Sequence, residues 1–363
     1  MTEKETPASS NDEETAQAQT TTEALEWHAP VLVRIDEHTT IPHLLKERVQ
    51  RGATRPLILR KIGIGDTWRS ITAREFYDEV HALAAGLIAR GLEPGDRVAI
   101  MSRTRYEWTL LDFACWAAGL VPVPIYETSS IDQVAHVLVD ADVHLIITET
   151  VSMAEIVRAA AERENRDNTH VLSLDSEAIE TLIAEGSATP RERVLARSEA
   201  LTKDDIATIV YTSGTTGTPK GTVLSHENFT NLCLNAHAWM PEIAAGKNSR
   251  LLLFLPLAHV FARFLQVFQI SGNGVLGHAP NIKNLLNDLA SFKPSYLLVV
   301  PRVLEKIYNS ADTKASGPKH KIFRWAAKVA IAYSQALDTE EGPTASLKAQ
   351  HALADKLVYQ QII

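Results

Sequence analysis

The sequence predicts an α/β fold in which mostly parallel sheets are flanked by helices. Two observations lead to this class. Short apolar runs alternate along the chain with amphipathic stretches at helical spacing, and the runs are apolar throughout instead of alternating with polar residues. Strands of that kind belong to parallel sheets covered on both faces, because a sheet with one wet face keeps polar residues on it.

The first clear unit begins with a helix over residues 71–90, where apolar residues recur at three- and four-residue spacing. Gly91 ends this helix as a C-terminal cap, and the turn EPGD leads into a strand at 97–102. A helix at 106–119 and a strand at 121–126 follow. This order and these lengths predict a parallel βαβ unit.

The same alternation continues along the rest of the chain. Further strands are expected at residues 144–149, 206–212, 250–256, 274–278 and 295–300. Further helices are expected at residues 131–140, 153–163, 225–240, 258–270, 282–292, 301–308, 319–337 and 345–360. Residues 164–203 are polar and weakly patterned, so we expect edge loops and a short connecting helix there.

An acidic N-terminal segment accounts for most of the net charge of −8. Residues 1–26 hold seven acids and one base, which leaves 35 bases against 37 acids elsewhere. We expect residues 1–27 to be a disordered acidic tail, because so few apolar residues cannot offset chain entropy. The nearly neutral remainder predicts no basic field for nucleic acid or for an anionic membrane surface.

The cysteines and the apolar runs indicate a cellular compartment. Cys115 and Cys233 match no metal-binding spacing and are expected as buried small residues in a reducing environment. The N-terminus lacks the features of a secretory signal. The runs at 251–256 and 296–301 are much shorter than the ~20 residues that cross a bilayer. We expect a cytoplasmic protein, with peripheral membrane contact left open.

The run YTSGTTGTPKG at residues 211–221 is typical of a loop that binds phosphate. It follows an apolar strand, its glycines permit close approach of the backbone to a ligand, and Lys220 adds a positive charge. Backbone N–H groups and hydroxyls around such a bend form a concave anion site. The candidate binding residues before the lysine are Thr212, Ser213, Gly214, Thr215, Thr216 and Gly217.

Two alternatives for this loop are less favoured. A Walker-type ATPase would need a lysine directly after the second glycine, whereas Thr218 and Pro219 stand between Gly217 and Lys220. A Gly/Ser/Thr cluster more often forms a flexible surface linker. This run is unbroken over residues 211–221 and comes directly after a core strand, so we favour a phosphate site.

His259, within LPLAHVFARF at residues 255–264, is the candidate catalytic residue. It follows the expected strand 250–256, and in doubly wound sheets ligands bind beyond the carboxyl ends of strands. A lone histidine beside apolar residues is more often part of the core. Its place one strand after the phosphate loop favours a functional role.

These motifs resemble those of a known superfamily. YTSGTTGTPKG resembles the phosphate-loop signature of the AMP-forming acyl-adenylating superfamily, and the segment around His259 resembles its next motif. Three further stretches, PIYETSS at 124–130, NIKNLLNDL at 281–289 and PSYLLVVPRVLEKIYN at 294–309, are together similar to bacterial long-chain fatty-acid–CoA ligases. The resemblance covers about residues 28–360.

The resemblance implies a large N-terminal adenylate-forming domain and a two-step reaction. A fatty carboxylate attacks ATP to give acyl-AMP and pyrophosphate, and coenzyme A then displaces AMP. Thr212 would contact the Mg²⁺ that accompanies ATP, the other loop residues and Lys220 would contact phosphate, and His259 would place the carboxylate and the α-phosphate. Some long-chain enzymes have a bulky gate residue four positions after this histidine, where this sequence has Arg263.

The resemblance also implies that the domain is incomplete at its C-terminus. The superfamily continues with adenine- and ribose-binding segments, an acidic magnesium contact and a mobile lid domain, and the sequence has no match for them. We expect residues 28–363 to be a partial AMP-binding domain without the lid domain, and the chain alone to be inactive or nearly so. The alternatives are another acid ligase of the superfamily, such as a fatty-acyl-AMP ligase, and a non-catalytic paralogue that binds nucleotide or acyl chains.

Overall fold

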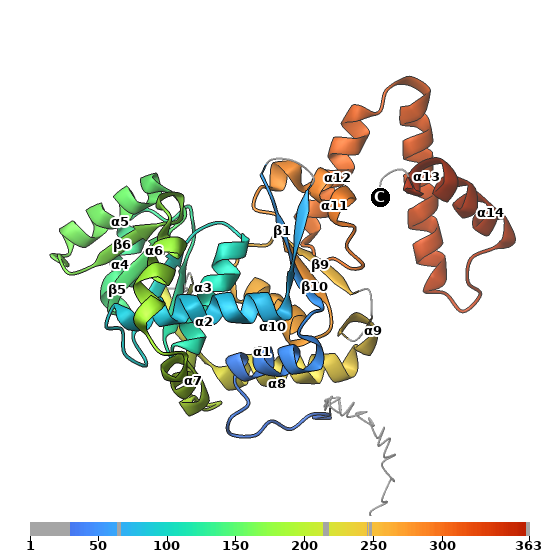
Figure 1. Cartoon of the computed structure of the whole chain (residues 1–363). Coiled ribbons are helices and arrows are strands. Elements are labelled where there is room, and N and C mark those ends of the chain that lie inside the picture. The colour runs from blue at the N-terminus through green and yellow to red at the C-terminus, as the bar shows by residue number, and fades with distance from the viewer. Residues whose placement is uncertain (1–29, 64–66, 213–217, 245, 247–248, 361–363) are drawn as a thin grey trace, which may run out of the picture. The chain divides into compact units, whose positions relative to one another are not determined.

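The computed structural model describes residues 30–63, 67–212, 218–244, 246 and 249–360. Within these residues the strands form two four-stranded sheets, here called sheet A and sheet B, and one two-stranded hairpin (Figure 1). The strands are β1 (Pro56–Lys61), β2 (Trp68–Thr72), β3 (Arg97–Met101), β4 (Val121–Ile125), β5 (Val143–Thr148), β6 (His170–Ser173), β7 (Ile206–Thr212), β8 (Lys220–Ser225), β9 (Arg250–Leu253) and β10 (Val275–His278).

Helices surround these strands and connect them (Figure 1). The helices up to β7 are α1 (Ile41–Gly52), α2 (Ala73–Ala89), α3 (Tyr106–Ala117), α4 (Ile131–Asp140), α5 (Val151–Arg163), α6 (Ala178–Glu185) and α7 (Arg191–Ala200). The later helices are α8 (His226–Trp239), α9 (Pro241–Ala244), α10 (Val260–Ser271), α11 (Leu285–Phe292), α12 (Pro301–Lys314), α13 (Gly317–Leu337) and α14 (Ala345–Ala354).

Sheet B is parallel throughout, in the order β4-β3-β5-β6. Its first three strands confirm the predicted strands at 97–102, 121–126 and 144–149 to within one residue at each end. The expectation of edge loops and one short helix at 164–203 is wrong, because β6, α6 and α7 occupy that region. These elements have few buried residues, so their apolar pattern is too weak to detect in the sequence.

Sheet A has the order β2-β1-β10-β9, with β2 antiparallel at one edge and the other pairs parallel. Two predicted strands are shorter than expected. The strand predicted at 250–256 ends at Leu253, ahead of a proline that cannot donate to a ladder. The strand predicted at 295–300 is reduced to one bridge, in which Tyr296 pairs with Leu251. The helix predicted from 71 begins at residue 73, because β2 extends to residue 72.

The third sheet is the antiparallel hairpin of β7 and β8, in which Thr212 lies opposite Lys220. The sequence predicted β7 correctly at 206–212 but gave no strand after the phosphate loop. Strand β8 was missed because it is short and mostly exposed, so it carries no continuous apolar run. The hairpin lies beside β4, and the hydroxyl of Thr208 donates to the carbonyl of Pro122 at 2.7 Å.

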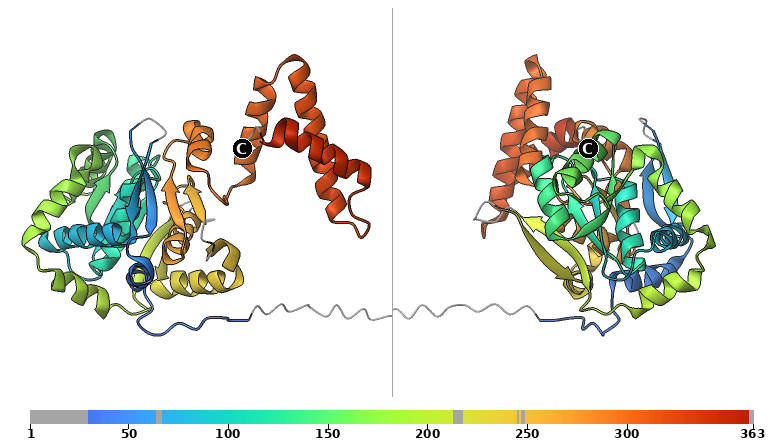
Figure 2. Two further views of the ribbon diagram at one scale, coloured as in Figure 1. Left: turned by 45° about the vertical axis from the view of Figure 1, so that its right-hand side comes forward. Right: turned by 90° about the vertical axis from the view of Figure 1, so that its left-hand side faces the viewer.

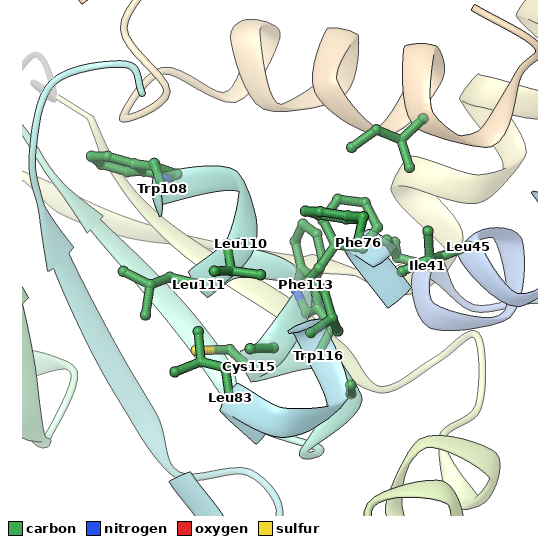
Figure 3. Packing of buried hydrophobic residues seen from close by; sticks show 14 of the residues in the cluster. Ile41, Leu45, Phe76, Leu83, Trp108, Leu110, Leu111, Phe113, Cys115 and Trp116 are labelled. Carbon is green, nitrogen blue, oxygen red and sulfur yellow. The ribbon is translucent and has the colours of Figure 1, made fainter. Parts of the chain in front are cut away.

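Helix α3 is the centre of the core. All of its residues are buried, and its aromatic and aliphatic side chains pack against α1 and α2 (Figure 3). Phe113 contacts Phe76 and Trp116 edge to face, with ring centroids 5.6 and 5.1 Å apart. A helix buried on all sides is stable only inside a protein, and each large apolar side chain buried here contributes about 1.5–3 kcal/mol.

The C-terminal part of the described chain is helical. Helices α13 and α14 pack against each other, and a small cluster of Ala326, Val329 and Ala354 lies between them (Figure 2). The helix predicted at 345–360 is confirmed, although its last turn, Asp355–Tyr359, is a π-helix. Among the described residues, no helix is both long enough and apolar enough to span a bilayer. Cys115 and Cys233 are both buried free thiols, as predicted.

Candidate functional site

The two ends of the phosphate loop are fixed by the hairpin. Thr212 is the last residue of β7 and Lys220 the first of β8, and both are exposed. Residues directly opposite each other in an antiparallel pair point to the same face. The hydroxyl and the ammonium therefore lie on one face of the hairpin. The predicted loop residues 213–217 lie outside the described residues.

Next to this pair, Tyr211 lies opposite Gly221, and the tyrosine ring covers the glycine. A Cβ atom on Gly221 would lie 3.2 Å from the ring, which is closer than side chains normally pack, and 2.9 Å from a methyl of Ile209. The small residue after the lysine thus permits this packing. The pKa of Tyr211 is raised by burial and by the hydrogen bond that its own hydroxyl donates to Asp140.

His259 lies at the N-terminus of α10, where it caps the helix. Its Nδ1 accepts a hydrogen bond from the backbone N–H of Phe261 at 3.2 Å. Because Nδ1 is the acceptor, the neutral imidazole carries its hydrogen on Nε2. The side chain is exposed, so this N–H can donate to an anionic oxygen. The N-terminal end of a twelve-residue helix adds favourable electrostatics for such a group.

Three segments that were singled out in the sequence meet at one cavity of ≈ 450 Å³. The first is the end of β4 with the start of PIYETSS, the second the base of the phosphate loop, and the third the histidine segment. The described residues that line the cavity are Pro124, Ile125, Tyr126, Ser129, Gln133, Val137, Val210, Tyr211, Thr212, Pro219, His259 and Val260. No carboxylate is among them, so the cavity wall does not repel an anion.

Helix α4 contacts both strands of the hairpin. The hydroxyl of Tyr211 donates to Asp140 at 2.6 Å, and the Nε2 of His136 lies 2.7 Å from the carbonyl oxygen of Pro219. The rings of His136 and Tyr211 meet edge to face with centroids 5.7 Å apart. These contacts join α4 to each side of the loop, and they could not be predicted from the sequence pattern.

On the opposite side, α10 is held by a buried ion pair. Arg263 donates to both carboxylate oxygens of Asp112 in α3, at 3.0 and 2.7 Å, and also to the hydroxyl of Thr208 in β7. Gln266 donates to the same carboxylate at 2.9 Å, and the guanidinium lies 5.5 Å from the centre of the Trp116 ring. Arg263 and Asp112 are fully buried, so this arginine is a structural link between α10, α3 and β7 and does not line the cavity.

Thr104 fixes the segment that precedes His259. Its buried hydroxyl donates to the carbonyl of Leu255 at 2.7 Å and accepts from the backbone N–H of Leu257 at 3.1 Å. These two bonds tie the chain after β9 to the loop between β3 and α3. The position of His259 is therefore set from two sides, by Thr104 before it and by the Arg263 ion pair after it.

A second cavity of ≈ 430 Å³ is lined by charged residues from β1, the loop after β3, the start of α3 and the end of β5. Its wall includes Glu107 and Glu149, which are largely buried and are paired with Arg60, Arg103 and Arg105. Burial alone would raise the pKa of Glu149, but the hydrogen bonds from Arg103 outweigh it and lower the pKa. The arginines here neutralise two buried carboxylates, so we interpret this cavity as the rim of an ion-pair network.

The fold and the candidate site define an α/β protein with a largely apolar cavity, free of carboxylates among its described lining residues, at the carboxyl ends of β4 and β7. A family model described as "AMP-binding enzyme" matches residues 45–345. The chain therefore belongs to the family of AMP-binding enzymes.

Known proteins similar to this chain agree with that assignment. The long-chain-fatty-acid–CoA ligase FadD15 of Mycobacterium bovis is 39% identical over 340 residues, which cover 93% of this chain. The chain spans 56% of the length of that relative.

Two solved structures share the fold. One is described as a Mycobacterium tuberculosis fatty acyl CoA synthetase, with a TM-score of 0.61 and 23% identity, covering 74% of this chain and 51% of that one. The other is the Klebsiella oxytoca NpsA N-terminal subdomain in complex with 3-hydroxyanthranilyl-AMSN, with a TM-score of 0.59 and 23% identity, covering 76% of this chain and 63% of that one. The predicted α/β fold of an adenylate-forming N-terminal domain is thus confirmed.

Proposed function

We propose that this chain is the nucleotide- and acyl-binding part of an AMP-forming long-chain fatty-acid–CoA ligase. Its substrates are a fatty acid, ATP and coenzyme A. The observation that carries the proposal is the meeting of the phosphate-loop base, the β4 end and His259 at one cavity. The similarity to a long-chain-fatty-acid–CoA ligase over 93% of the chain supports the acyl substrate class.

We assign a role to each candidate residue. Thr212, Ser213, Gly214, Thr215, Thr216 and Gly217 bind the β- and γ-phosphates, and Lys220 offsets their charge. His259 donates its Nε2–H to an oxygen of the carboxylate or the α-phosphate, and so holds the two anions in line for attack. The protein contribution to this step is positioning and charge stabilisation, as in other phosphoryl transfers.

Magnesium fits this site as an ion that arrives with the nucleotide. Among the described residues, no three His, Cys, Asp or Glu side chains gather as a metal site. Mg²⁺ commonly takes phosphate oxygens and water as most of its ligands. The exposed hydroxyl of Thr212 is therefore suited to be one protein ligand, and the ion would neutralise charge on the phosphates.

We further propose that residues 28–363 form part of an AMP-binding domain, preceded by an acidic tail at 1–27. The reaction is assigned to the cytoplasm, with peripheral membrane contact where a fatty acid would be collected. Two buried free thiols support a reducing compartment.

Titration of the chain with MgATP tests the nucleotide part of the proposal. We expect binding, and we expect Lys220→Ala to weaken it by tenfold or more, since a charge-assisted contact to phosphate is worth about 1.5–3 kcal/mol. Lys348→Ala, at an exposed lysine of α14, is the matched control and should leave the affinity unchanged. Equal affinity of Lys220→Ala and the unaltered chain would contradict the proposed phosphate site.

Mass-spectrometric detection of acyl-AMP tests the substrate class. The chain is incubated with MgATP and either palmitate or benzoate, alone and together with a fragment of FadD15 that supplies the part of that relative beyond the match. Palmitoyl-AMP is expected, at least in the supplemented reaction. Benzoyl-AMP alone would indicate another acid ligase of the family, and nucleotide binding without either adenylate would indicate a non-catalytic binding protein.

A further inference from the structure

The segment that carries Lys220 has little support apart from the hairpin itself. Strand β8 is half-exposed or exposed along its length, and its outer edge pairs with no other described strand. Among the described residues, a single hydrogen bond reaches residues 218–224 from outside the hairpin, and it comes from His136 of α4. Leu224, toward the other end of β8, packs against the core, so at the Lys220 end this hydrogen bond is the contact we expect to influence how firmly the loop is held.

The direction of that hydrogen bond is fixed by its acceptor. A backbone carbonyl can only accept, so the Nε2 of His136 must carry the hydrogen that is donated to Pro219. The neighbouring residue is Lys220, whose ammonium is the one positive charge that the sequence places in the loop. A carbonyl fixed one peptide before this lysine restricts the direction in which its side chain leaves the strand.

A second contact on the same face of α4 holds the other strand. His136 and Asp140 are four residues apart, so they lie on one face of the helix, and Asp140 binds the hydroxyl of Tyr211. Gln133 and Val137, from the same side of α4, line the candidate cavity. One helix face thus contacts the hairpin on both sides of the loop and forms part of the binding cavity.

We propose that His136 is a positioning residue for the phosphate loop, whose imidazole N–H holds the Pro219 carbonyl and so sets where Lys220 presents its charge. This inference rests on the proposed function, because it assigns to His136 a share in binding the pyrophosphate end of ATP. It adds to that function a residue outside all of the recognised motifs. His136 acts through the loop and does not itself contact the ligand.

The test compares three variants. His136→Phe keeps a ring against Tyr211 but removes the donor, while His136→Gln keeps an N–H at similar reach. His170→Phe changes an exposed histidine of β6, at the edge of sheet B opposite β4, and is the control. Hydrogen–deuterium exchange of peptides covering residues 218–225 reports the hold on the hairpin, and titration with magnesium pyrophosphate reports binding without any need for adenine contacts.

We expect His136→Phe to exchange faster at residues 218–225 and to bind magnesium pyrophosphate about three- to tenfold more weakly, the range for one lost hydrogen bond. His136→Gln should recover most of both effects, and His170→Phe should show neither. Unchanged exchange in His136→Phe would overturn the inference. So would faster exchange with unchanged affinity, provided that Lys220→Ala weakens binding.

The same titration separates this inference from the proposed function. If Lys220→Ala leaves magnesium pyrophosphate binding unchanged, or if the unaltered chain shows no binding, the phosphate site itself is wrong and the role of His136 in binding falls with it. If Lys220→Ala weakens binding but His136→Phe does not, the proposed function stands and the inference about His136 is wrong.

Discussion

The two walls of the candidate cavity are held in different ways. The α10 wall is anchored by Arg263 and Asp112, which are fully buried and bonded through two parallel hydrogen bonds. On the hairpin wall, β7 shares this buried anchor through Thr208, whereas the contacts of Tyr211 and of the segment leading into β8 are only partly buried. We therefore expect the α10 wall to be the more stable one and the β8 side of the hairpin to open at lower cost. Ligand-binding loops commonly belong to the less stable parts of a fold, because they must move to admit the ligand.

The largest effect is expected when the ion pair that anchors the α10 wall is removed. Arg263→Met leaves the Asp112 carboxylate buried without its partner, and we expect a loss of about 3–5 kcal/mol in the free energy of unfolding, measured with urea. The control, Arg163→Met, removes an exposed ion pair with Asp132 and should cost at most about 1 kcal/mol. The double change Arg263→Met with Asp112→Leu should recover part of the loss. If Arg263→Met and Arg163→Met lowered the free energy of unfolding equally, the buried ion pair would not anchor the α10 wall.

The second prediction concerns pH and the same buried network. His278, at the end of β10, is hydrogen-bonded to Thr109 of α3, and burial lowers its pKa to about 4. An unfolded histidine takes up a proton below about pH 6.5, while the folded one does so only near pH 4. Stability contributed by the neutral imidazole is therefore present above pH 6.5 and is lost as the pH falls toward 4, by an amount on the order of 3 kcal/mol.

The pH prediction is checked with His278→Gln, which cannot titrate. The free energy of unfolding measured from pH 7 to pH 4 should fall less steeply for this variant than for the unaltered chain. His170→Gln, at an exposed position of β6, should leave the slope unchanged. A slope that His278→Gln does not alter would mean that other groups cause the acid sensitivity.

The third prediction concerns the segment before His259, which Thr104 holds. Thr104→Val removes the hydroxyl that bonds to Leu255 and Leu257, and it leaves both backbone groups without that partner. We expect a loss of about 1–3 kcal/mol in unfolding free energy and faster hydrogen exchange at residues 255–259. Thr104→Ser retains the hydroxyl and should behave nearly as the unaltered chain. If exchange rises only elsewhere, Thr104 does not fix the histidine segment.

The smallest effect is expected on the hairpin wall. Tyr211→Phe removes the hydrogen bond to Asp140, and because this pair is partly exposed to water the cost should be about 1 kcal/mol or less. The matched change Tyr308→Phe affects an exposed tyrosine of α12 and should cost nothing measurable. A loss as large as that of Arg263→Met would remove the difference between the two walls.

Much of the fold could be predicted from the sequence because it depends on local pattern. Apolar runs and helical spacing identified three of the four strands of sheet B and most helices, and the glycine–threonine run and His259 pointed to segments that border the candidate cavity. Helix α1 and strands β1 and β2 were not predicted, although the apolar residues of α1 have helical spacing. Other missed elements carry weak local signals. Strands β6 and β8 are short and lack a continuous buried run, so periodicity does not distinguish them from loops.

The contacts that hold the site could not be predicted, because they join residues far apart in the chain. Asp112 and Arg263 are separated by 151 positions and Thr104 and Leu255 by the same number, and no local pattern specifies such partners. Arg263 stood out only as a residue at the position of a gate, and its burial in an ion pair became visible only in the fold. His136 gave no signal, since a half-buried histidine on an amphipathic helix is commonplace.

The two free thiols can report local unfolding of the helices that bury them. Cys115 lies in the central helix and Cys233 in α8, and both side chains are fully buried. Burial raises the pKa of both thiols, which suppresses the reactive thiolate in the closed state. Alkylation by a small reagent then requires the surrounding helices to separate. The labelling rate of each cysteine therefore reports local unfolding around it, without any engineered probe.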